Sequence, residues 1–249
     1  MKGKGVLDQH VHPQAQGIDA VVAAAHELKA PLVLINHLTD ALNDPAISLS
    51  PSERQQHLRR LRLTSERMVR LVQQLTLSYR FETDAQLTMA FPTEPVSVNE
   101  VASMALHELT PYATEHDQTL RLHEVRCHHV VLANRDVLHD IVVNLVDNAI
   151  RHNSAKGVVD VMSHCQQQHV RLSVHDNGAG VGLAELHRLR RSLGVEPQPL
   201  SGRAGTSGLG LYIVGQFAQA MGGSFGVGRQ GVGATFFVDL IKSWQLSLL

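Results

Sequence analysis

Two long heptad patterns near the start of the chain restrict its fold more than any other feature. In each, apolar or small residues recur at alternating intervals of three and four, the spacing of helices that pack along a seam. The first pattern consists of Ile18, Val21, Ala25, Leu28, Leu32, Ile35, Thr39 and Leu42. The second consists of Leu58, Leu61, Ser65, Met68, Val72, Leu75 and Tyr79. Asn43-Asp44-Pro45 breaks the first pattern, so the two predict a helical hairpin.

A two-helix hairpin cannot enclose its own apolar seam, so the seam needs a further partner. We expect a second copy of the chain to supply it, which makes a homodimeric four-helix bundle. The alternative is that the hairpin packs on the rest of its own chain. The second helix should begin with a capping box, with Ser50 as N-cap, Pro51 at the first helical position and Glu53 two residues further on.

The overall composition excludes several classes of protein. The 249 residues include 22 basic and 23 acidic side chains, a balance that disfavours a general nucleic-acid binder. Hydrophobic residues make up 43%, enough for a core, yet no apolar run approaches the ~20 residues of a membrane span. The first ten residues lack the apolar segment of a secretory signal. Cys127 and Cys165 are too few for a disulfide framework, so we expect a cytoplasmic location.

The pattern changes after the second helix. We expect a flexible N-terminal arm over 1–17, the hairpin over 18–82, a linker over 83–95 and a folded domain over 96–249. In that domain, helical and alternating patterns are mixed, which is typical of an α/β sandwich with helices on one face of a sheet. The expected helices cover 98–114, 135–152, 183–193 and 209–221. The expected strands cover 119–125, 158–163 and 170–174, followed by two that end near 240, and 194–207 should be a loop.

The first motif of this domain lies on the helix expected over 135–152. Asn144, Asn148 and Arg151 fall on one helical face at i, i+4 and i+7. Amide oxygens can coordinate Mg²⁺, and an arginine on the same face can reach phosphate oxygens. A merely hydrated polar face would give the same pattern.

The second motif, Asp176-Asn177-Gly178-Ala179-Gly180, directly follows an expected strand. A carboxylate there can accept a hydrogen bond from an exocyclic amine such as that of adenine, and the glycines let the backbone approach a planar ligand. An ordinary tight turn is the alternative.

The third motif, Gly205-Thr206-Ser207-Gly208-Leu209-Gly210, opens the last expected helix. Helix-start N–H groups in flexible glycine-rich backbone form a site for phosphate, and Arg203 just before it is a candidate contact to the terminal phosphate.

In this order, the three motifs resemble the ATP-binding domain shared by sensor histidine kinases, DNA gyrase B, Hsp90 and MutL, the GHKL superfamily. The resemblance implies ATP and Mg²⁺ as ligands. It assigns Asn148 to the metal and Asp176 to the adenine, while His152 stands where the family often has Tyr or His near the nucleotide. The glycine loop, including Ser207, Gly208, Leu209 and Gly210, would close over the phosphates.

Asn144 distinguishes transfer from hydrolysis within this superfamily. The ATPase branches place a glutamate there to activate water, and an amide cannot accept a proton as a general base. The phosphoryl group should therefore pass to another acceptor. The string His26-Glu27-Leu28-Lys29-Ala30-Pro31-Leu32 on the first helix resembles the phosphoacceptor box of histidine kinases. His26 would be the nucleophile, and Glu27 could accept the imidazole proton.

The resemblance implies a kinase that phosphorylates His26 and passes the phosphoryl group to an aspartate in a response regulator receiver domain. A separate sensory protein could inform it, or the chain could be the catalytic part of a larger membrane sensor. Three features depart from the family, one of them being Thr206 and Ser207 where a Gly-Thr pair is frequent. Ala30 replaces the Thr or Asn that positions water for dephosphorylation, so we expect weak phosphatase activity, and 182–207 lacks the usual aromatic box.

Two other interpretations stay open. One is a dimeric scaffold or phosphotransfer protein with a degenerate ATP site, and the other is a serine kinase or ATPase of the same superfamily. The sequence also leaves open whether phosphorylation occurs within one chain or between two.

Overall fold

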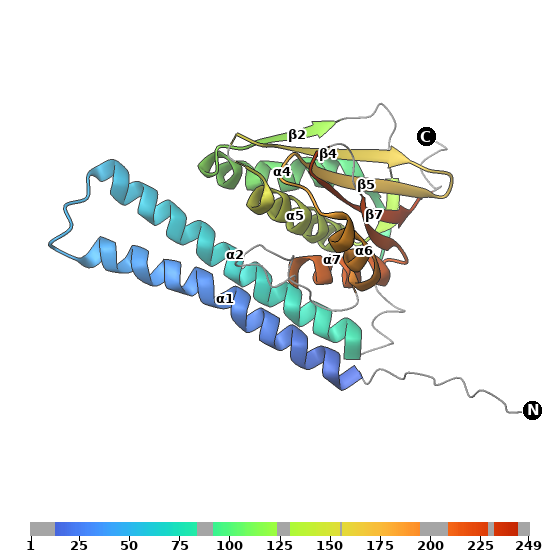
Figure 1. The fold of residues 1–249 in the computed structure, drawn as a ribbon, viewed down its shortest axis with the longest axis horizontal. Coiled ribbons are helices and arrows are strands. Elements are labelled where there is room, and N and C mark those ends of the chain that lie inside the picture. Colours follow the sequence, from blue (N-terminus) through green and yellow to red (C-terminus); the bar gives the residue numbers. More distant parts are fainter. Residues whose placement is uncertain are drawn as a thin grey trace, which may run out of the picture.

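The computed structural model describes residues 13–83, 92–123, 130–154, 156–194, 209–228 and 232–243. The first two helices, α1 (Pro13–Asn43) and α2 (Pro51–Thr83), form an antiparallel hairpin (Figure 1). α1 begins inside the stretch expected as a flexible arm and continues through Pro31. The capping box of α2 is confirmed, because the Glu53 N–H donates to Ser50 Oγ at 3.3 Å and the Ser50 N–H donates to Glu53 Oε2 at 2.8 Å.

A five-stranded sheet organises the rest of the described chain. Its strands lie in the order β2-β4-β5-β7-β6, with β2 and β4 parallel and the other neighbours antiparallel. Their bounds are β2 Thr119–His123, β4 Val158–Cys165, β5 His169–Asp176, β6 Ser224–Gly228 and β7 Ala234–Ile241. On β4 and β5, buried residues alternate with half-buried ones, so one face of each strand lies in the core.

Helices cover that face, and they lie between the sheet and the hairpin (Figure 1). They are α4 Val98–Glu115, α5 Arg135–His152, α6 Leu183–Ser192 and α7 Leu209–Ala220. Leu138, Ile141 and Leu145 of α5 and Phe217 of α7 are completely or almost completely buried against the strands. This arrangement confirms the expected α/β sandwich, and the bounds of α5 agree with the prediction.

Two short strands lie outside the prediction. β1 (Glu94–Ser97) pairs antiparallel with β3 (Val130–Ala133), and neither pattern is long enough to alternate clearly. β1 overlaps the end of the expected linker, where Pro95 suggested irregular backbone. A two-stranded sheet exposes an edge that tolerates proline, so this expectation was wrong for Glu94 and Pro95. In the part of the chain that the structure describes, no helix is both long and apolar enough to cross a membrane.

Candidate functional site

The helix α5 carries the first sequence motif on the face opposite its core residues. Asn134 caps the helix by accepting a hydrogen bond from the Val137 N–H at 3.2 Å. Asn144 Nδ2 donates to the Asp140 carbonyl at 2.9 Å, while Asn144 Oδ1 lies toward Gly210 at the start of α7. The buried Asn148 Nδ2 has no hydrogen-bond partner within the described ranges. Such an orphaned amide is a feature of a binding site whose ligand completes it.

The second motif lies at the end of β5. Asp176 is 2% exposed, and its Oδ1 accepts hydrogen bonds from the Gly178 N–H at 3.0 Å and the Ala234 N–H at 3.4 Å. A Cβ on Gly178 would lie 2.6 Å from the His152 carbonyl oxygen at the end of α5. Gly180 has a φ of +72°, a conformation that favours glycine. Gly178 therefore lets the Asp176 loop lie directly against the last turn of α5, and a Cβ on Gly180 would lie 2.8 Å from the Gly233 carbonyl oxygen.

The third motif lies only in part within the described residues. α7 begins at the buried Leu209, and Gly210 follows it next to Asn144. Arg203, Ser207 and Gly208 lie outside the described residues, as do most of the loop expected over 194–207 and Cys127.

A cavity of about 1020 Å³ lies between the hairpin and the α/β domain. His26 and Glu27 of α1 line it, opposite Asn144, Asn148 and Arg151 of α5. Gly210 also lines this cavity. His26 is exposed, and Glu27 is half-buried. His152, Asp176, Gly178, Gly180 and Leu209 do not line this cavity.

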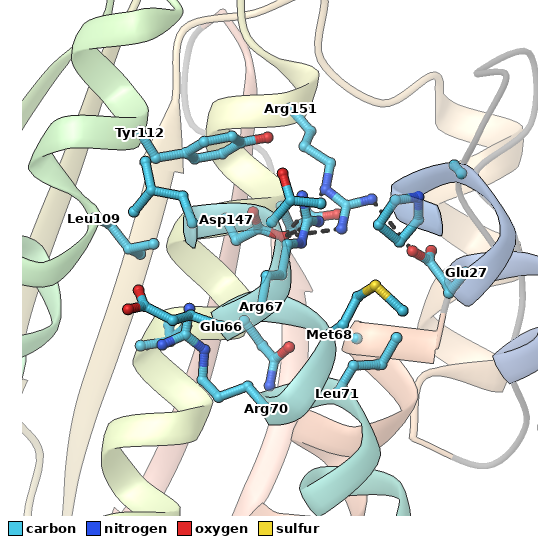
Figure 2. A pocket seen from close by; sticks show the side chains of 18 of the residues that line it. Glu27, Glu66, Arg67, Met68, Arg70, Leu71, Leu109, Tyr112, Asp147 and Arg151 are labelled. Atoms are coloured by element: carbon cyan, nitrogen blue, oxygen red, sulfur yellow. Dashed lines mark hydrogen bonds and ion pairs between the residues drawn. The ribbon is translucent and has the colours of Figure 1, made fainter. Parts of the chain in front are cut away.

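Sequence reasoning missed a chain of ion pairs across the cavity (Figure 2). Arg67 Nη2 of α2 lies 2.9 Å from Asp147 Oδ2 of α5. Arg151 Nη2 lies 3.1 Å from the same oxygen, and its Nη1 lies 3.5 Å from Glu27 Oε2. Arg67 also lies over the ring of Tyr112, 5.7 Å from its centroid. Burial raises the pKa of Asp147, an effect that the Arg67 charge opposes.

These ion pairs bring together two residues to which the sequence analysis gave separate roles. Arg151 was expected at the phosphates and Glu27 beside the phosphoacceptor, and in the structure they form an ion pair. The sequence did hold one signal for these ion pairs, the acidic residue Asp147, which lies between the candidate ligands Asn144 and Asn148. Its partner Arg67 lies 80 positions away in the sequence, so no local pattern connects the two.

The chain is similar to known proteins in sequence and in fold. Residues 133–243 match the family described as "Histidine kinase-, DNA gyrase B-, and HSP90-like ATPase". The chain is 34% identical over 224 residues to the sensor protein kinase PmrB of Pseudomonas aeruginosa, covering 88% of this chain and 44% of that protein. It is 32% identical over 220 residues to the sensor protein CutS of Streptomyces coelicolor, covering 87% of this chain and 51% of that protein. The chain thus spans about half the length of these curated relatives.

Solved structures show the same fold. Histidine kinase AdeS of Acinetobacter baumannii aligns with a TM-score of 0.57 at 19% identity, over 87% of this chain and 97% of that chain. Full-length ShkA, solved in complex with AMPPNP, aligns with a TM-score of 0.59 at 22% identity, over 94% of this chain and 46% of that chain. Residues 133–243 thus match the histidine kinase-, DNA gyrase B- and HSP90-like ATPase family, and the chain is similar to sensor histidine kinases over most of its length.

Proposed function

We propose that this protein is an ATP-dependent histidine kinase that phosphorylates His26 and then transfers the phosphoryl group to an aspartate of a response regulator receiver domain. The observation that carries the proposal is the shared cavity. His26 lines it on one side, and Asn144, Asn148 and Arg151 line it on the other. A phosphoacceptor and a phosphate-binding face in one cavity favour direct transfer between them.

The residues present fit a nucleotide with Mg²⁺. The unpaired atom of Asn148 is its buried amide nitrogen Nδ2, a donor that suits a phosphate oxygen and would leave the amide oxygen for a metal, and the Asn144 oxygen is directed toward the start of α7. We assign Asn148, helped by Asn144, to Mg²⁺, which would offset phosphate charge. Asp176 would accept a hydrogen bond from the adenine amine. Arg151 would move from Glu27 toward the phosphates, since a polyphosphate is the stronger anion for it.

The chemistry requires a nucleophile and a proton acceptor. One ring nitrogen of His26 would form a bond to the γ-phosphorus of ATP as the bond to the bridging oxygen breaks, and ADP would leave. Glu27 would accept the proton from the other ring nitrogen. Movement of Arg151 to the phosphates would break its ion pair with Glu27, which would link nucleotide binding to the step in which Glu27 accepts the proton. The subsequent acceptor, a receiver-domain aspartate, is implied by the resemblance to sensor kinases.

A homodimer belongs to this proposal. Within one chain the two seams are only half covered. Leu28, Ile35, Leu61, Met68 and Leu75 are half-buried, whereas their neighbours along the seam are exposed. The exposed members are Ala25, Leu32, Thr39, Leu58, Ser65, Val72 and Tyr79. Since exposed and half-buried members alternate every heptad, a second hairpin would complete the bundle.

Labelling with γ-labelled ATP and Mg²⁺ tests the proposal. We expect the wild type to acquire an acid-labile, base-stable label, because phosphohistidine hydrolyses in acid. His26→Gln should lose the label and keep its affinity for a fluorescent ATP analogue. His37→Gln is the matched control, because His37 is an exposed histidine on the same helix, and its labelling should equal the wild type. Acid-labile label that persists in His26→Gln would disprove the assignment.

A further inference from the structure

An acidic side chain lies at the edge of the face that we assign to phosphate. Asp147 directly precedes Asn148 on α5, and Arg151 follows it one turn later. A carboxylate beside a polyphosphate opposes nucleotide binding by charge repulsion. Asp147 lines the shared cavity and its side chain is only 17% exposed, so solvent screens this charge only in part. A carboxylate at this position therefore needs a role that outweighs the repulsion.

Asp147 contacts the guanidinium of Arg151 along one edge. Its Oδ2 accepts a hydrogen bond from Arg151 Nε at 3.1 Å, and Arg151 Nη2 lies 3.1 Å from the same oxygen. The third nitrogen, Nη1, lies 3.5 Å from Glu27 Oε2, so Arg151 lies between two acids (Figure 2). Asp147 and Arg151 both belong to α5, and their contact therefore does not depend on which hairpin the domain meets.

The shape of a guanidinium makes this contact directional. The group is planar and rigid, so an anion that holds its Nε–Nη2 edge also fixes the direction of Nη1. The side chain of Arg151 is 25% exposed, whereas those of the Arg62–Glu66 pair, which has the same i,i+4 spacing on α2, are 81% and 49% exposed. An exposed pair contributes little, while the shielded pair on α5 restricts how its arginine can turn.

We propose that Asp147 is a positioning residue, which keeps the Nε–Nη2 edge of Arg151 fixed while Nη1 exchanges Glu27 for the γ-phosphate of ATP. This inference rests on the proposed kinase activity. Asp147 acts through Arg151 in the transfer step, because an arginine that is bound but badly directed stabilises the charge of the transferred phosphoryl group poorly. It adds nothing to nucleotide affinity, since its own charge repels the phosphates.

Arg67 is changed first, because Asp147→Asn alone would leave its guanidinium without the carboxylate 2.9 Å away. The reference protein is therefore Arg67→Gln, and the test protein combines Arg67→Gln with Asp147→Asn. We expect the test protein to label roughly tenfold more slowly than the reference at saturating ATP and Mg²⁺. Its Kd for a fluorescent ATP analogue should stay equal or fall. Arg62→Gln in the same reference breaks the exposed pair on α2 and should label like the reference.

A double-mutant cycle shows whether Asp147 acts through Arg151. Lysine keeps the positive charge but lacks the planar edge, so Arg151→Lys removes the group that Asp147 directs. With Arg151→Lys added to the reference, Asp147→Asn should change the labelling rate by less than about twofold. An equal loss of rate with arginine and with lysine at position 151 would overturn the proposal, because Asp147 would then act independently of Arg151.

Nuclear magnetic resonance tests the same contact without catalysis. The Nε–H signal of Arg151, identified by its loss in Arg151→Lys, should exchange slowly with water in the reference protein, because Asp147 Oδ2 accepts its hydrogen bond. A non-hydrolysable ATP analogue with Mg²⁺ should leave the exchange slow, whereas Asp147→Asn should make it fast. Fast exchange on addition of the analogue would overturn the proposal, since Arg151 would then leave Asp147 altogether.

Two further results would count against the positioning role. One is a labelling rate that Asp147→Asn leaves unchanged, and the other is a nucleotide Kd that rises in step with the loss of rate. Should the test protein not fold, as judged by its thermal transition, Asp147→Ser in the same reference repeats the comparison. Failure of the proposed function would show differently, because the wild type would then acquire no label that depends on His26, while the Arg151 signal would still report the contact with Asp147.

Discussion

Asp140 shows how a single buried carboxylate affects this protein. It lies on α5 where that helix meets α2, and Gln74 of α2 forms a side-chain hydrogen bond with it. Burial raises its pKa above the ordinary Asp value, an effect that Gln74 and nearby cations oppose. The folded state therefore holds the proton more tightly than the unfolded chain does. Stability from the protonated form is present below the unfolded pKa and is lost as pH rises through the raised one.

Asp140→Asn should therefore raise the urea midpoint of unfolding at pH 7. The substitution keeps an acceptor oxygen for Gln74 and removes the charge that burial penalises. The gain should shrink as the pH falls, because the native carboxyl takes up its proton at a higher pH than the unfolded one does. Asp40→Asn, an exposed position on α1, is the control and should leave the midpoint unchanged at both pH values. A lower midpoint for Asp140→Asn at pH 7 would mean that attraction to Arg70 outweighs the cost of burial.

At the scale of elements, the contact between α6 and α7 depends on two glycines. Gly194 follows α6 with a φ of +72°, and its backbone touches Gly215 in the middle of α7. Gln216 Nε2 donates to the Gly194 carbonyl at 3.0 Å. A Cβ on Gly215 would overlap the Gly194 Cα, so the two elements would have to separate.

Gly215→Ala should destabilise the domain by roughly 1–3 kcal/mol, the usual cost of overpacking a tight contact. Urea unfolding followed by far-UV circular dichroism measures it. Gly182→Ala is the matched control, because Gly182 caps α6 and nothing lies within 4 Å of its added Cβ. Equal midpoints for Gly215→Ala and the wild type would show that α6 moves away at little cost.

Element patterns and interdomain contacts differ in how well a sequence predicts them. A pattern that repeats over several turns or pleats is easy to recognise, and the sequence therefore predicted the long helices α5 and α7 and the alternating strands β4 and β5. β1 and β3 have four residues each and were missed. The local motifs predicted the residues of the α5 face. The pairing of Arg67 with Asp147 depends on how two separately patterned units pack, and such long-range contacts leave no periodic trace.

At the scale of the whole molecule, two surfaces of the hairpin differ in what covers them. One holds Arg67 and Arg70 of α2 against the α/β domain, and the other presents the exposed half of each seam. Leu32 and Val72 belong to that half and are 47% and 49% exposed. If a second copy covers them, dimerisation and domain docking use separate surfaces of the same two helices, and each can be removed alone.

Leu32→Glu combined with Val72→Glu should convert the dimer to a monomer, because the bundle would bury four uncompensated carboxylates at its seam. Size-exclusion chromatography with light scattering at micromolar concentration measures the mass. Val33→Glu is the control, since Val33 is 44% exposed but lies outside the heptad seam, and it should remain dimeric. A wild type that is already monomeric would contradict the dimer.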